Sequence, residues 1–96
     1  MSQARTKEKT KRQRVMLALE APDAKEVVLA GDFNKWNAKS HPMKKDMSGV
    51  WKRSVMLPPG RYEYKFLVDG QWRNDPKNDK TCPNRFGTRN SVLTTS

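Results

Sequence analysis

Two tryptophans of this chain, Trp36 and Trp72, lie among polar residues, where an indole ring can meet a ligand rather than fill a core. Lys35 and Asn37 flank the first, and Gln71 precedes the second. A flat indole buries apolar area against the C–H face of a sugar ring, whose hydrogens meet its negative π face. Lysine and asparagine can then hydrogen-bond the hydroxyl groups at the edge of that ring. These residue types indicate noncovalent binding of a flat, hydroxylated ligand, a carbohydrate above all.

The three tryptophans of the chain differ in their local patterns. Trp51 is in phase with Val55 and Leu57 on an alternating segment, so it is predicted to pack in the core. Trp36 lies in a loop region, which favours exposure. The pattern around Trp72 leaves both a core and a surface position open.

Hairpin register links Trp72 to a lysine. Asp69-Gly70 separates two strand-like runs and favours a type I′ turn, in which both central residues have positive φ. That turn sets Leu67 opposite Trp72, and cross-strand partners share a face of the sheet. Lys65 alternates onto the same face, diagonal to Trp72, although an ordinary solvated lysine would follow the same alternation. The other face carries the residues expected in the core: Tyr62, Tyr64, Phe66 and Val68.

The rest of the chain has the pattern of short strands joined by turns, with no amphipathic helix. Such a pattern predicts an all-β sandwich. The expected strands cover residues 15–19, 26–30, 51–57, 62–68, 71–73 and 91–95. Residues 32–49 are expected to form a long loop or a loose edge of the sheet, and residues 74–84 a polar loop.

Length and charge bound the possible functions. The 96 residues suffice for one domain with a modest core and no large catalytic cleft. The net charge is +10, with 20 Lys and Arg against 10 Asp and Glu, and much of the excess lies near the N-terminus. We expect residues 1–13 to form a disordered basic tail and residues 14–96 to form the sandwich. Such a tail serves more often to solubilise than as a nucleic-acid arm, though both roles fit.

Cysteine usage and hydropathy predict the cellular setting. Cys82 is the single cysteine, so the chain alone forms no disulfide and no cysteine zinc site. That usage is typical of a reducing compartment. The chain contains no apolar run that could span a membrane and no secretory h-region. We therefore expect a cytoplasmic protein without a membrane partner.

The sequence offers little for catalysis. His41, the single histidine, lies in a polar loop without an evident partner, and Cys82 has no Cys-His signature beside it. The acidic residues are scattered through turns, whereas a glycosidase needs two carboxylates placed across a cleft. Phosphate-loop and metal-ligand spacings are also lacking. We expect a protein that is not an enzyme and that uses no cofactor and no metal.

An ordered set of motifs runs through the chain: Val28–Trp36, Pro42-Met43, Gly49–Trp51, Leu57–Gly60, Tyr62–Trp72, Asp75-Pro76 and Asn84–Asn90. This set resembles the family 48 carbohydrate-binding modules. These include the glycogen-binding domain of the AMP-activated protein kinase β subunit and the N-terminal modules of branching and debranching enzymes. The resemblance implies an immunoglobulin-like β-sandwich that binds α-1,4-linked glucans such as glycogen, starch or maltodextrin.

The resemblance also implies a set of binding residues. Two tryptophans cradle the glucan in the glycogen-binding members, a sheet lysine assists them, and a loop between the last strands supplies one apolar and two polar contacts. Phe86 departs from the leucine that is usual in the kinase version. The matching residues are Trp36, Trp72, Lys65, Phe86, Thr88 and Asn90.

Two other functions remain open at this point. The first is a protein-interaction module that docks a glycogen-metabolising enzyme without binding sugar. The second, less favoured, is a nucleic-acid-binding domain that uses the basic tail and exposed aromatic residues.

Overall fold

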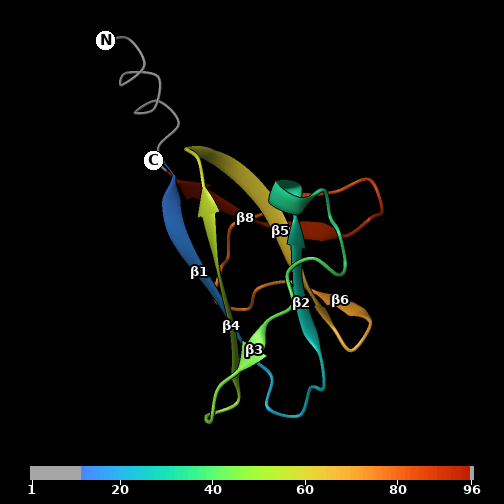
Figure 1. Ribbon diagram of the computed structural model, residues 1–96. Coiled ribbons are helices and arrows are strands. Elements are labelled where there is room, and N and C mark those ends of the chain that lie inside the picture. The colour runs from blue at the N-terminus through green and yellow to red at the C-terminus, as the bar shows by residue number, and fades with distance from the viewer. Residues whose placement is uncertain (1–11, 96) are drawn as a thin grey trace, which may run out of the picture.

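Two antiparallel sheets make up the part of the chain that the computed structural model describes, residues 12–95 (Figure 1). The first sheet has the strand order β1-β4-β3, and the second has the order β2-β5-β8-β7, with β6 also paired to β5. The elements are β1 (Gln13–Glu20), β2 (Val27–Gly31), the 3-10 helix η1 (Asp32–Asn34), β3 (Lys44–Lys45), β4 (Val50–Leu57), β5 (Gly60–Val68), β6 (Gln71–Arg73), β7 (Thr81–Pro83) and β8 (Arg89–Thr95).

The core lies between the two sheets, because alternation turns one face of each strand toward the other sheet. The predicted all-β sandwich is therefore confirmed. Trp51 is buried in this core, as predicted, and its indole N–H donates to the carbonyl oxygen of Ala21 at 2.9 Å. The core residues are Leu17, Leu19, Ala21, Val27, Leu29, Met43, Trp51, Val55, Leu57, Tyr64, Phe66 and Val68.

The predicted hairpin is confirmed in both its turn and its register. Asp69 and Gly70 have φ values of 48° and 84°, as a type I′ turn requires. Leu67 pairs with Trp72, so the indole lies on the face of β5 that points away from the core. The Asp69 carboxylate also accepts the backbone N–H groups of Lys25 and Glu26, which fixes the turn against the start of β2.

Residues 32–49 contain a short edge strand, which fits the loose-edge alternative, and an unexpected 3-10 helix, whereas the loop predicted for residues 74–84 is wrong at β7. η1 and the two-residue strand β3 lie within residues 32–49, and β7 lies within residues 74–84. β3 and β7 form through backbone pairing with β4 and β8, which side-chain patterns do not signal in such short segments. At the N-terminal side, β1 begins at Gln13, and the predicted tail falls almost entirely outside the described residues. Within residues 12–95, no helix has the length and apolar character needed to cross a membrane.

Candidate functional site

The indole rings of Trp36 and Trp72 meet on the outer face of the larger sheet. Their centroids are 6.2 Å apart and their planes are inclined by 72°, an edge-to-face arrangement. Trp72 is 47% exposed, which decides its position in favour of the surface. Trp36 is half-buried, so the exposure predicted for it is only partial. Segments more than thirty residues apart thus build one aromatic platform.

A tight turn after β2 carries Trp36 to this platform. Lys35 and Trp36 both adopt left-handed backbone conformations, with φ values of 56° and 58°. The backbone N–H of Trp36 donates to the carbonyl oxygen of Gly31 at 2.9 Å, and its indole N–H donates to Asp32 Oδ1 at 3.1 Å. Asp32 Oδ2 accepts the backbone N–H of Glu63 on β5 at 2.9 Å. The carboxylate of Asp32 therefore ties the indole to the sheet.

Gly31 and Asn34 make the turn possible. A Cβ at Gly31 would overlap the carbonyl oxygen of Glu63 and lie 2.9 Å from the Cβ of Tyr64, so β2 and β5 approach too closely there for a larger residue. Asn34 Oδ1 accepts the N–H of Gly31 at 3.0 Å, and its Nδ2 donates to the carbonyl oxygen of Leu29 at 3.2 Å. One amide therefore closes the turn on both sides.

Lys65 lies beside the platform and is buried rather than solvated. Its side chain is only 8% exposed, and Nζ donates to Thr88 Oγ1 at 3.1 Å. The alternation correctly turned Lys65 away from the core, but the solvated alternative is wrong because the loop after β7 covers its ammonium group. This hydrogen bond joins the sheet face that carries Trp72 to the loop that carries the other predicted residues.

The loop between β7 and β8 presents one apolar and two polar side chains. Phe86 is 80% exposed, and among the described residues it makes no aromatic ring contact. Thr88 is exposed as well, whereas Asn90 is buried at the start of β8 and donates to Glu63 Oε1 at 2.9 Å. Asn84 bridges Thr88 and Asn90, so Lys65, Thr88 and Asn90 belong to one hydrogen-bonded group, while Phe86 projects from the same loop.

Besides Asn34, sequence reasoning missed three residues that hold this arrangement. Asp32 fixes Trp36, Glu63 fixes Asn90, and Asn84 organises the loop. The phase of Glu63, two residues before Lys65, could have placed it on the same face. Asn84 stands three residues before Gly87, a spacing typical of a side-chain-stabilised turn, and Gly87 has a φ of 82°.

The carboxylate of Glu63 is kept ionised by its neighbours. Hydrogen bonds from Asn90 and then from Cys82 lower the pKa of Glu63, and the guanidinium of Arg61 at 3.1 Å lowers it further. An ionised carboxylate can only accept hydrogen bonds, which fixes the direction of the bond from Asn90. The described residues contain no cluster of three or more His, Cys, Asp or Glu side chains suited to a metal ion.

His41 has partners that its sequence context did not reveal. Asn34 Nδ2 lies 3.0 Å from its Nδ1, and the ring packs edge-on against Phe33 with centroids 5.9 Å apart. Ser40 Oγ also lies 3.0 Å from Nδ1, so Nδ1 has two polar neighbours. Burial lowers the pKa of His41, and the charge of Arg53 lowers it further. The lack of a partner inferred from the sequence is therefore wrong.

The lowered pKa of His41 predicts that the protein loses stability on mild acidification. The unfolded chain takes up the His41 proton near its ordinary pKa of 6.5, whereas the folded chain does so only at lower pH. The free energy of unfolding should therefore fall as the pH drops through about 6.5. Urea unfolding at several pH values measures this slope, and the slope should become shallower in His41→Gln. An equal slope in both proteins would contradict this assignment.

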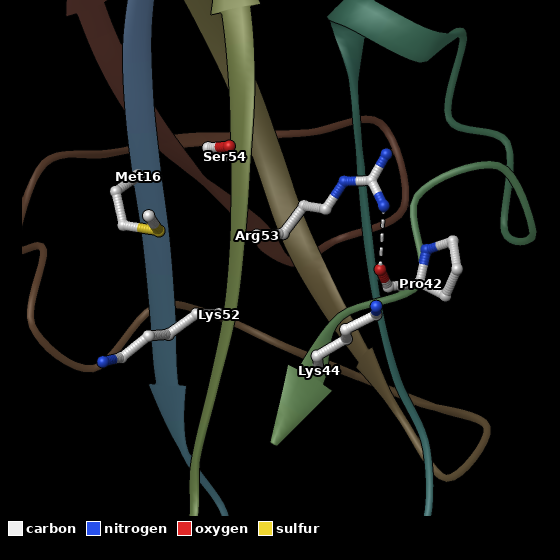
Figure 2. Close-up of a pocket in the computed structure, with 6 residues that line it drawn as sticks. All are labelled: Met16, Pro42, Lys44, Lys52, Arg53 and Ser54. Atoms are coloured by element: carbon white, nitrogen blue, oxygen red, sulfur yellow. Dashed lines mark hydrogen bonds between the residues drawn. The ribbon is translucent and has the colours of Figure 1, made fainter. Parts of the chain in front are cut away.

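A shallow depression on the opposite sheet is chemically different from the platform. It is lined by Met16, Pro42, Lys44, Lys52, Arg53 and Ser54. Figure 2 shows Lys52 extending across β1, whereas Lys44 and Arg53 extend to the other side, toward Pro42. Arg53 donates to the carbonyl oxygen of Pro42 at 3.2 Å, and Lys52 is paired with Asp46 at 3.2 Å. The cations diverge and no aromatic ring lines the floor, so this depression has no stacking surface.

The chain is similar to several longer proteins. It is 42% identical over 74% of its length to Protein FLOURY ENDOSPERM 6, chloroplastic, of Oryza sativa subsp. japonica, and covers 13% of that protein. It is 38% identical over 72% of its length to the 5'-AMP-activated protein kinase subunit beta-1 of Sus scrofa, covering 53% of it. It is 36% identical over 67% of its length to the 1,4-alpha-glucan branching enzyme GlgB of Prochlorococcus marinus, covering 8% of it. The chain thus spans about half or less of each of these relatives.

A family profile described as the glycogen recognition site of AMP-activated protein kinase matches residues 14–96. That range includes both tryptophans, Lys65 and the loop before β8. It agrees with the resemblance to family 48 carbohydrate-binding modules, a non-catalytic type of domain. The chain therefore belongs to the family of AMP-activated protein kinase glycogen-recognition domains.

Proposed function

We propose that the outer face of β5, β6 and β8 binds α-1,4-linked glucans, such as glycogen, starch or maltodextrin, without catalysing a reaction. The observation that carries the proposal is the contact of Trp36 with Trp72 beside a buried, hydrogen-bonded lysine. Two indoles inclined to one another suit a curved ligand, and an α-1,4-linked chain of glucose units curves. The polar group beside them suits the hydroxyl groups of the sugar rings.

Each side chain has a role in this proposal. Trp36 and Trp72 stack on sugar rings, while Lys65 and Asn90 hydrogen-bond sugar hydroxyls. Phe86 and Thr88 complete the rim of the site. The names of the relatives support the ligand class, since one relative is a 1,4-alpha-glucan branching enzyme. Docking to a glycogen-metabolising enzyme and a cytoplasmic location stay predictions.

Such a site should bind weakly to a single chain and more tightly to a polymer. The surface is open, so water competes with the protein for the sugar hydroxyls. We expect a dissociation constant roughly in the micromolar to millimolar range for a short maltooligosaccharide. Branched glycogen offers many sites and should raise the apparent affinity through multivalency when the protein is displayed in several copies.

Calorimetric titration with maltoheptaose tests the proposal. A neutral ligand releases few counterions, so the affinity should change little between about 50 mM and 300 mM salt. A cellooligosaccharide of equal length is the matched control, since its β-1,4 linkage makes a straighter chain, and it should bind more weakly. No heat with maltoheptaose from a folded protein would contradict the proposal and favour the docking function. Steep salt dependence of binding to a single-stranded oligonucleotide would instead favour nucleic acid.

A further inference from the structure

We propose that Asn84 is a positioning residue that makes the hydroxyl group of Thr88 a hydrogen-bond donor to the bound glucan. The inference rests on the proposed function and deepens it. It follows from the direction of each hydrogen bond in the group formed by Lys65, Thr88, Asn84, Asn90 and Glu63.

Backbone groups fix the orientation of the Asn84 amide. Its Oδ1 accepts the backbone N–H of Phe86 at 2.9 Å and that of Thr88 at 3.1 Å. Backbone N–H groups can only donate, so the oxygen of the amide must face them. The nitrogen must then face the other way, where Nδ2 donates to Thr88 Oγ1 at 2.8 Å and to Asn90 Oδ1 at 2.9 Å.

The contacts of Glu63 and Asn90 require the same orientation of the Asn84 amide. Glu63 is an ionised acceptor, so the group of Asn90 that meets Glu63 Oε1 at 2.9 Å must be its Nδ2. Asn90 therefore turns its Oδ1 toward Asn84 and needs a donor there. Asn84 Nδ2 is that donor, and the two independent arguments agree.

The Thr88 hydroxyl group can still donate one hydrogen bond. Its Oγ1 accepts from Asn84 Nδ2 at 2.8 Å and from Lys65 Nζ at 3.1 Å, and an ammonium group can only donate. Both lone pairs of the hydroxyl oxygen are therefore occupied. No acceptor within residues 12–95 takes its proton, and the side chain is exposed. The hydroxyl thus offers a proton to the ligand and selects a sugar oxygen that accepts.

Asn84→Asp keeps the size and shape of the side chain but replaces the amide donor that faces Thr88 with a carboxylate oxygen. The carboxylate still accepts both backbone N–H groups of the loop, so the loop should keep its conformation. It cannot donate to Thr88 or to Asn90, and it draws the proton of the Thr88 hydroxyl toward itself. We expect the affinity for maltoheptaose to fall about fivefold, as for the loss of one hydrogen bond. Thr88→Val, which lacks the hydroxyl, should show a loss of similar size.

The double variant separates this role from a merely structural one. Asn84→Asp combined with Thr88→Val should bind no more weakly than Asn84→Asp alone, because Thr88 no longer donates to the ligand once Asn84 is Asp. Thr88→Ser keeps the hydroxyl and should retain more affinity for maltoheptaose than Thr88→Val. Melting temperatures within a few degrees of the wild type would show that the loop and the fold are retained.

Two results would overturn the inference in a protein that binds maltoheptaose. One is wild-type affinity in Asn84→Asp, and the other is a double variant whose loss equals the sum of the single losses. Lack of binding by the wild type would contradict the proposed function itself, and the inference would fall with it because Thr88 would have no sugar acceptor.

Discussion

Trp72→Ala should weaken the binding of maltoheptaose by at least about thirtyfold, which corresponds to the roughly 2 kcal/mol typical of an aromatic hot spot. The indole is 47% exposed and supplies a stacking surface that alanine cannot replace. Trp36 meets it at 6.2 Å, so Trp36→Ala should have a comparable effect on affinity. Calorimetric titration of both variants against the wild type measures the losses.

The stability of the Trp72 variant distinguishes a binding role from a packing role. An exposed side chain contributes little to folding, so the free energy of unfolding should change by no more than about 0.5 kcal/mol. Trp72→Phe is the matched control, since it keeps a smaller ring at the same position and should retain part of the affinity. Unchanged binding in both Trp72→Ala and Trp36→Ala would contradict the proposed site.

Trp51→Ala should have the opposite profile and cost about 3–5 kcal/mol of stability, the usual range for truncating a buried aromatic side chain. The indole is buried, its N–H donates to the carbonyl oxygen of Ala21 at 2.9 Å, and Lys45 Nζ lies 5.7 Å from the ring centroid. Truncation opens a cavity between the sheets and leaves the Ala21 carbonyl without its partner. Urea unfolding measures the loss through the midpoint and the slope of the transition.

Trp51→Phe is the graded control for this prediction. It keeps most of the packing and loses the indole N–H, so it should cost less than the alanine variant. Because Trp51 faces the core, the folded fraction of either variant should bind maltoheptaose with near wild-type affinity. A Trp51→Ala protein of wild-type stability that no longer binds would contradict the assignment of Trp51 to the core.

The sequence predicted most of the sheet that carries the site. Alternation along residues 62–68 and the turn at Asp69-Gly70 were enough to place Lys65 and Trp72 on one face, because strand period and turn geometry are local. The burial of Lys65 was not predictable in this way. The burial of Lys65 depends on Thr88, which lies in the loop between β7 and β8. Such a long-range contact leaves no pattern in the local sequence.

The same distinction explains the missed residues around Trp36. Asp32 acts through a backbone N–H on β5, and Asn34 acts through Leu29 and His41, so each role appears only once the strands are paired. The resemblance to family 48 modules, in which two tryptophans cradle one glucan, predicts that Trp36 lies on the same face as Trp72. The contact between the two indoles agrees with that expectation.

Residue-by-residue NMR of the labelled protein during titration with maltoheptaose tests the central claim most directly. We expect the largest chemical-shift changes at the indole N–H groups of Trp36 and Trp72 and at the backbone amides of residues 84–90. Met16 and Lys52, on the opposite sheet, should stay unchanged and serve as the internal control. Changes centred on that opposite face, or none at either tryptophan at saturating sugar, would contradict the account.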